Sequence, residues 1–293
     1  MGEQIWDVAG KLTQWQYTGY PRLNGVIPPN IGNLTNLKSL DLNDNNLDGL
    51  IPETIKNLIN LNYLNLHDNE LSGEIPENIG SLTNLTSLDL SKNELIGEIP
   101  ASIGDLTNLV SLDLNKNHLR DEIPSSIENL INLEFLDLSN NTLGCYQHYN
   151  SQYSCEITCA VSNKCNGEIP DAIGKLINLT VLDLRSNDLS GPIPESIGDL
   201  TSLNTLYLRE TNLSGEIPES IGDLINLEVL NLRENNLSGE IPESIGSLIN
   251  LVVLNLRENN LSGEIPESIG NLINLSSLDL SKNELTGKIP ESI

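Results

Sequence analysis

Four arginines recur at one position of 24-residue units in the second half of the chain. They are Arg185, Arg209, Arg233 and Arg257. A guanidinium group offers a rigid pair of donors for carboxylates and phosphates, so the row predicts an anionic or sugar-rich partner. The alternative is internal duplication, in which the arginines pair with the glutamates that follow three of them, Glu210, Glu234 and Glu258.

Aspartates form a second row at a neighbouring position, Asp89, Asp113, Asp137 and Asp183, with Asp41 further out. Stacked carboxylates could attract Ca²⁺ or a basic peptide. The alternative, which we favour, is a motif residue that bonds locally and stays solvated, so we predict no metal site and no cofactor. Three aromatic residues break the repeat on the same predicted face, Tyr63, Phe135 and Tyr207. Because exposed aromatics are typical interface anchors, we predict that they bind a partner.

All four cysteines lie in one insertion, with the spacing C-x9-C-x3-C-x5-C: Cys145, Cys155, Cys159 and Cys165. A long loop without core residues needs cross-links to stay ordered, so we predict two disulfides, with three pairings open. A zinc site is the competing interpretation, although this spacing matches no common ligand pattern. Paired cysteines would indicate an oxidising compartment. Tyr146 and Tyr149 are candidate binding residues here, and a tolerated surface insertion is the alternative.

The repeat must position these side chains. Its letters are Leu37-x-x-Leu40-x-Leu42-x-x-Asn45-x-Leu47-x-Gly49-x-Ile51-Pro52, and stepping by 24 residues reproduces them through Pro290, interrupted by the insertion. Leu40 and Leu42 alternate with polar neighbours, as in a short strand with one buried face. Ten stacked units therefore predict a parallel sheet that lines a concave surface. The recurring asparagine is expected to bond the turn backbone of adjacent units, because a buried amide without partners is costly. Thr211 interrupts this asparagine series once.

The motif from Leu230 through Asn235, Gly239, Ile241 and Pro242 resembles the plant-specific class of leucine-rich repeats. That class occurs in receptor kinases, receptor-like proteins and polygalacturonase inhibitors. The resemblance covers about nine tenths of the chain and implies an α/β repeat solenoid, a twisted horseshoe or superhelix. It also implies an extracellular setting and ligand recognition on the concave face or an adjoining side, with islands between repeats that can help form ligand sites. The paired-cysteine caps usual in the class are missing here.

Four segments are predicted: an N-terminal cap over residues 1–22, repeats over 23–143, a cysteine-rich island over 144–166 and repeats over 167–293 without a C-terminal cap. A solenoid end exposes apolar core and an unpaired strand edge. End-to-end assembly into a fibre, wall or capsid is therefore the structural alternative to recognition.

The net charge and the modification signals limit what the chain can bind and where it functions. With 15 Lys and Arg against 41 Asp and Glu, the net charge is −26, which argues against nucleic-acid binding. No apolar run is long enough to span a membrane, and no signal peptide is visible, so a secreted protein would have lost its signal. Eight Asn-x-Ser/Thr acceptors agree with secretion, although the repeat letters themselves generate most of them. These are Asn33, Asn84, Asn140, Asn178, Asn212, Asn236, Asn260 and Asn274.

No converging catalytic groups are visible, so we predict that the chain is not an enzyme. The leading hypothesis is an extracellular recognition module that binds a protein, peptide or carbohydrate through its concave face or island. An inhibitor of the polygalacturonase-inhibitor kind is one version of this hypothesis. Ice binding is an outlying alternative, because a regular polar array can order water.

Overall fold

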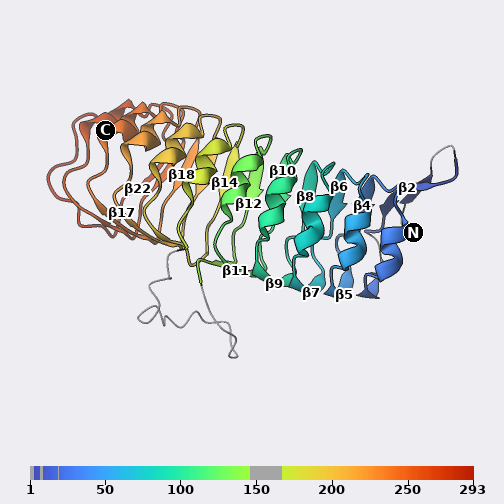
Figure 1. Ribbon diagram of the computed structural model, residues 1–293. Coiled ribbons are helices and arrows are strands. Elements are labelled where there is room, and N and C mark those ends of the chain that lie inside the picture. Colours follow the sequence, from blue (N-terminus) through green and yellow to red (C-terminus); the bar gives the residue numbers. More distant parts are fainter. Residues whose placement is uncertain (1–2, 7–8, 19, 146–166) are drawn as a thin grey trace. The chain divides into compact units, whose positions relative to one another are not determined.

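The computed structural model describes residues 3–6, 9–18, 20–145 and 167–293. The chain forms two compact units (Figure 1). The first unit contains residues 1–120 and 126–141, and the second contains residues 121–125 and 142–293.

The main sheet of the first unit begins with an antiparallel hairpin of β1 (Glu3–Trp6) and β2 (Leu12–Gln16). β2 then pairs in parallel with the first repeat strand. Five three-residue strands continue the sheet in chain order: β4 (Ser39–Asp41), β6 (Tyr63–Asn65), β8 (Ser87–Asp89), β10 (Ser111–Asp113) and β12 (Phe135–Asp137). The central leucine of each strand points into the core, since alternate residues of a strand face opposite sides.

A second parallel sheet follows in the same unit, which the sequence analysis did not predict. Its strands are β3 (Asn24–Val26), β5 (Asn46–Leu50), β7 (Glu70–Glu74), β9 (Glu94–Glu98) and β11 (His118–Asp121). From β5 onward, these strands begin just after the recurring asparagine. Each coil of the first unit therefore contributes one strand to each of two sheets.

The second unit repeats this plan. Its main sheet orders β14 (Val181–Asp183), β16 (Thr205–Tyr207), β18 (Val229–Asn231), β20 (Val253–Asn255) and β22 (Ser277–Asp279). β13 (Thr142–Leu143) is the first strand of the second unit in the sequence and does not belong to this main sheet. A shorter second sheet contains β15 (Ser190–Gly191), β17 (Asn212–Gly215), β19 (Asn236–Gly239) and β21 (Asn260–Leu261).

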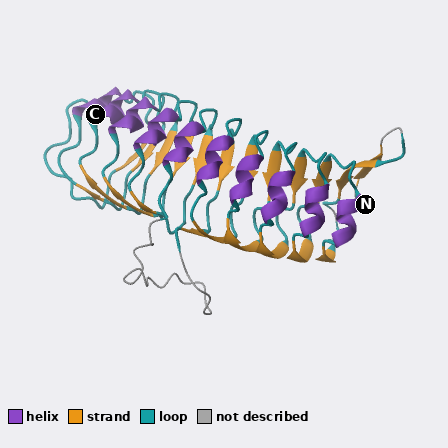
Figure 2. Cartoon of the chain, viewed as in Figure 1, coloured by secondary structure: helices purple, strands orange, loops and turns teal. Residues whose placement is uncertain are grey.

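One 3₁₀ helix of five residues lies on the return path of each coil (Figure 2). A proline with extended backbone precedes most of these helices, for example Pro100 before η4 (Ala101–Asp105), and its fixed φ suits this position. Gly80 in η3 permits close packing on the next coil, because a Cβ there would collide with the carbonyl of Ser102. The ten helices of the described residues are η1 (Pro29–Asn33), η2 (Glu53–Asn57), η3 (Glu77–Ser81), η4 (Ala101–Asp105), η5 (Ser125–Asn129), η6 (Asp171–Lys175), η7 (Glu195–Asp199), η8 (Glu219–Asp223), η9 (Glu243–Ser247) and η10 (Glu267–Asn271).

The core is made of the repeat leucines and isoleucines, most of them fully buried. The recurring asparagines form a hydrogen-bonded series that we call the asparagine ladder. Asn117 is representative: its Nδ2 lies 3.0, 3.1 and 3.3 Å from the carbonyls of Leu90, Leu114 and Asn115, and its Oδ1 accepts from the amide of Leu95 at 3.0 Å. The predicted α/β repeat solenoid and its asparagine network are confirmed.

The predicted cap contributes strands but little core. β2 extends the main sheet through its pairing with β4, whereas Trp6 and Tyr20 are exposed, at 57% and 95%. Among the described residues, no helix is long and apolar enough to cross a membrane.

Candidate functional site

The arginine row lies on the exposed face of the main sheet of the second unit. Strands β14 to β22 pair in strict register, so residues at equivalent repeat positions become direct neighbours. The arginines come two residues after each strand's last position and keep 33–39% of their side chains exposed. We call Arg185, Arg209, Arg233 and Arg257 the arginine column.

Carboxylates accompany every member of this column. Arg185 lies 3.0 Å from Asp183, and Arg209 lies 3.3 Å from Glu210. Arg233 pairs with Glu234, and Arg257 lies 3.8 Å from Glu258 and 3.9 Å from Asp279. The mutual pairing that the sequence left as an alternative is therefore present in the structure.

The pairing does not use all the arginine donors. The Nε atoms of Arg209, Arg233 and Arg257 are buried without a hydrogen-bond partner. Arg185 covers the ring of Tyr207, with its guanidinium carbon 5.1 Å from the ring centroid, which is within the range of a cation–π interaction. Each guanidinium has five N–H groups, so donors remain for a ligand after one carboxylate is bound.

The acidic neighbours of the column are stabilised as carboxylates. A hydrogen bond from the Ser186 hydroxyl, at 2.7 Å, and then the charge of Arg209 lower the pKa of Glu210. The ammonium of Lys282, 2.9 Å away, lowers the pKa of Glu258. Bonds from the hydroxyl and amide of Ser281 lower the pKa of Asp279. The face therefore carries positive and negative groups side by side.

The aspartate row lies on the main-sheet face of the first unit except for Asp183, which ends β14 of the second unit. Asp113 pairs in register with Asp89 on one side and Asp137 on the other. Burial and the two neighbouring carboxylates raise the pKa of Asp113 to about 7, against the opposing effect of bonds from Asn115. At the start of the row, burial raises the pKa of Asp41. Asp41 and Asp183 are 7% and 3% exposed, so the expectation of solvated side chains is wrong for these two.

The aspartates of this row have local hydrogen-bond partners. Among the described residues, no group of three or more His, Cys, Asp or Glu side chains could hold a metal ion. The aspartates instead bond locally: Asp89 accepts from the amide and hydroxyl of Ser91, and Asp113 accepts from the amide of Asn115.

The three predicted aromatic anchors are half-buried, not exposed as expected. Tyr63 accepts a hydrogen bond from Asn65 at 3.1 Å, and Tyr207 lies beneath Arg185. Tyr63 also lines a pocket of about 270 Å³ with Ile5, Gln14, Gln16, Ser39 and Asp41, beside the N-terminal hairpin. Phe135 begins β12 in the same unit.

The island prediction lies mostly outside the described residues. This applies to Tyr146, Tyr149, Cys155, Cys159 and Cys165, while Cys145 is buried at the edge of the described chain. The disulfides therefore stay a prediction. All eight predicted glycan acceptors are exposed. Asn84 and Asn274 use their Nδ2 atoms to bond the carbonyls of Ile59 and Ile249, at 2.7 and 2.8 Å.

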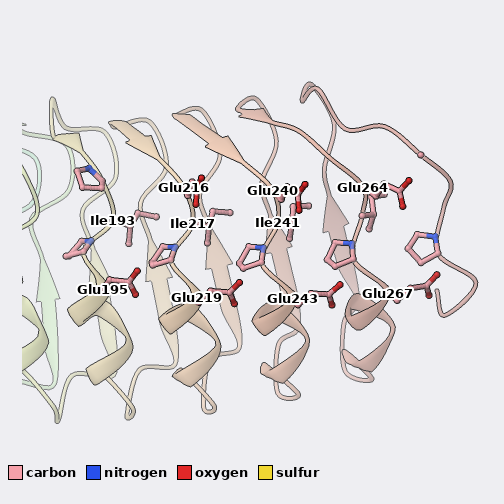
Figure 3. A pocket seen from close by; sticks show the side chains of 18 of the residues that line it. Ile193, Glu195, Glu216, Ile217, Glu219, Glu240, Ile241, Glu243, Glu264 and Glu267 are labelled. Carbon is pink, nitrogen blue, oxygen red and sulfur yellow. The ribbon is translucent and has the colours of Figure 1, made fainter.

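A groove that the sequence analysis missed crosses the return path of the second unit, with a volume of about 1640 Å³. Figure 3 shows isoleucines between glutamates of two kinds, those that precede an isoleucine, such as Glu216, and those that begin a helix, such as Glu219. Ten carboxylates and one lysine, Lys288, line it. The recurring letters Gly-Glu-Ile-Pro-Glu could have indicated this groove.

Comparison with known proteins gives family matches over most of the chain. A family model described as a leucine-rich repeat region matches residues 51–150 and 196–288, and a model for the leucine-rich repeat matches residues 36–58 and 178–200. No curated protein matches the sequence.

Three solved structures illustrate the similarity. The Arabidopsis receptor kinase HAESA, in complex with the peptide hormone IDA and the co-receptor SERK1, is 33% identical with a TM-score of 0.80, over 97% of this chain and 48% of that chain. PEPR1, solved with AtPEP1, is 32% identical with a TM-score of 0.78, over 99% and 44%. A plant ice-binding protein is 28% identical with a TM-score of 0.73, over 98% and 86%. The chain thus spans less than half of the two receptors and most of the ice-binding protein.

Proposed function

Because this chain belongs to the plant-type leucine-rich-repeat proteins, we propose that it is a non-enzymatic recognition module that binds a peptide or protein ligand. The proposed site is the main-sheet face of the second unit, over the arginine column and Tyr207. The chain is homologous to the repeat ectodomains of peptide-hormone receptors, and HAESA and PEPR1 support a peptide as the ligand class. Tyr63, Phe135 and a carbohydrate ligand remain secondary proposals.

The observation that carries the proposal is the state of the arginine column. Four guanidinium groups are each about one third exposed and lie beside carboxylates, and the Nε atoms of Arg209, Arg233 and Arg257 have no hydrogen-bond partner. A ligand meets pre-oriented side chains there, so less conformational entropy is lost on binding than with free arginines. A ligand carboxylate can bond the remaining donors without displacing the internal partner.

We also propose an extracellular setting, in which the island is cross-linked by two disulfides. The exposed glycan acceptors and the likeness to receptor kinases support it. Non-reducing mass spectrometry of natural material is the test. Free thiols together with an absence of glycans would contradict this setting.

Selection of a random peptide library on the intact chain tests the binding site. Peptides enriched by the wild type should lose at least about tenfold in affinity, equivalent to about 1.4 kcal/mol, for the double variant Arg209→Gln/Arg233→Gln. Glu216→Gln/Glu240→Gln is the matched control, because it neutralises two charges on the return path and should leave affinity unchanged. Equal affinity of the arginine variant and the wild type would overturn the assignment of the site.

A second candidate function is ice binding. It is favoured by the similarity to a plant ice-binding protein of which this chain covers 86%, against less than half of the receptors. Inhibition of ice recrystallisation by the purified chain is the direct measurement. An inactive wild type would exclude this second candidate and leave the peptide proposal untouched.

A further inference from the structure

Exposed β-branched side chains form a column along the coils. Each member comes directly after the leucine that follows a 3₁₀ helix, and the residue after it is usually asparagine. Every one of the ten coils has threonine or isoleucine there, and all ten are exposed. In the first unit these are Thr35, Ile59, Thr83, Thr107 and Ile131. In the second unit they are Ile177, Thr201, Ile225, Ile249 and Ile273, which we call the Thr/Ile column.

The isoleucines of this column are unusually exposed for their type. Ile177, Ile225 and Ile249 expose 53–55% of their area, and Ile273 exposes 83%. Isoleucine is among the residues most often found fully buried. A continuous row of such side chains on a surface indicates contact with another phase or molecule.

The backbone holds the column rigidly in the second unit. The amides of Thr201, Ile225, Ile249 and Ile273 each bond the carbonyl two residues earlier at 2.9 Å. Asparagine amides of the following coil donate to the carbonyls of Thr201, Ile225 and Ile249, each at 2.8 Å. β-Branched side chains also have restricted χ1 angles. The methyl groups therefore repeat at fixed positions from coil to coil.

The uniformity of the column indicates what kind of partner it fits. The last strand position of the same coils changes from Asp183 to Tyr207 to Asn231, as expected of a surface that recognises one irregular ligand. The arginine column of that face repeats, but its side chains are charged and paired with carboxylates. The Thr/Ile column instead presents an uncharged β-branched side chain at every coil. Such a column, on coils whose strands lie about 4.8 Å apart, matches a partner that itself repeats. A crystal surface or a regular polymer has this property.

The chemistry of the column favours one of these two repeating partners, a crystal surface or a regular polymer. It carries no charge and no aromatic ring, so it offers neither an ion pair nor a stacking surface for a sugar polymer. It offers methyl groups, around which water is ordered, with a threonine hydroxyl at one coil. We infer that the Thr/Ile column is the surface on which the second unit binds ice. This inference rests on ice binding, the second candidate function above.

The test compares three double variants of the intact chain in an ice-recrystallisation assay. Ile225→Lys/Ile249→Lys places two hydrated charges in the column and should raise the inhibitory concentration at least about tenfold. Ile225→Thr/Ile249→Thr keeps a β-branched methyl at both coils and should retain most of the activity. Asn236→Lys/Asn260→Lys adds the same charge to the second sheet of neighbouring coils and should match the wild type.

The outcomes distinguish whether the column is the ice-binding surface from whether the chain binds ice at all. If the wild type inhibits recrystallisation and the column lysine variant does so equally well, the column is not the ice-binding surface, although ice binding stands. If the wild type is inactive, both the function and the inference are wrong. Thermal melting of each variant checks that it is folded. If the threonine variant also loses activity at unchanged stability, the expectation that threonine can replace isoleucine in the column is wrong.

Discussion

The main-sheet faces of the two units use the same strands and registers but carry charge differently. In the first unit, Asp89, Asp113 and Asp137 are direct neighbours, and the pKa of the central carboxyl is raised to about 7. In the second unit, acidic groups stand beside arginine or lysine, and the pKa values of Glu210 and Asp279 are lowered. One face accumulates unpaired like charge, whereas the other sets each positive group beside a negative one.

The difference follows from stacking in register. Copying a repeat places each residue beside its own copy, so a duplicated charge becomes its own neighbour. A lone acidic position is therefore penalised each time it is copied. A repeat that carries Arg233 next to Glu234 copies both charges together, which keeps the face neutral on average. On this face of the second unit, the near-identical repeats thus carry their charged residues as pairs.

The largest expected effect comes from the asparagine ladder, which both units share. Asn117→Ala removes a buried amide and leaves the Leu95 amide and the Leu90 carbonyl without this partner. We expect a loss of about 3 kcal/mol in the free energy of unfolding, measured by urea denaturation. Asn236→Ala, at an exposed position, is the control and should cost less than about 0.5 kcal/mol. Similar losses for the two variants would show that the ladder does not stabilise the fold.

The next effect tests the aspartate face directly. Because the folded-state pKa of Asp113 is raised from 3.8 to about 7, the folded chain binds the proton more tightly than the unfolded chain. This contribution to stability is fully present below pH 4 and is lost as the pH rises through 7. Asp113→Asn should remove this dependence and raise stability at pH 8 by about 1–2 kcal/mol, after allowance for solvent screening at a half-exposed site.

The matched control lies on the second face. The pKa of Asp279 is lowered in the folded state, so its contribution is present above the unfolded value and is lost as the pH falls. Asp279→Asn should change the pH dependence of the free energy of unfolding in the opposite sense, and only at acidic pH. Urea denaturation of both variants between pH 3 and pH 8 gives the comparison. The same slope for wild type and Asp113→Asn between pH 4 and 7 would contradict the account of the first face.

Sequence alone predicted the parts of this fold that depend on a repeated residue type. Alternating leucines predicted the main sheet, and the fixed asparagine predicted a satisfied network. The second sheet was missed, because the segment from Asn46 to Leu50 contains a glycine and too few alternating apolar residues to indicate a strand. The 3₁₀ helices are a single short turn with no helical periodicity to detect.

Site prediction depended on contacts that no repeat letter encodes. Tyr207 was expected to be exposed, but Arg185 from the preceding coil covers its ring. The raised pKa of Asp113 depends on burial as well as on its neighbours. The Thr/Ile column was visible in the sequence as Leu-Thr/Ile-Asn-Leu, but its importance depends on the exposure of the isoleucines, which only the structure gives.

A smaller effect concerns Thr211, which interrupts the asparagine ladder in the second unit. At the position of a ladder asparagine, the Thr211 hydroxyl lies 2.9 Å from the carbonyl of Leu208 and 2.6 Å from Oδ1 of Asn235. Its one proton can serve only one of them, whereas an asparagine supplies two protons and an acceptor. Thr211→Asn should therefore raise the free energy of unfolding by about 1 kcal/mol in urea denaturation. Thr211→Val should lower it, and a gain from valine would contradict the hydrogen-bond explanation.

The smallest expected effect concerns the ion pairs of the arginine column. Arg233→Gln breaks the pair with Glu234 at a site where the arginine is about one third exposed. Ion pairs in contact with solvent contribute about 0–1 kcal/mol, so the urea midpoint should barely move. A loss above about 2 kcal/mol would mean that the column is structural. A stable variant that loses peptide affinity would instead separate binding from folding, because its unchanged stability assigns the lost affinity to the guanidinium group itself.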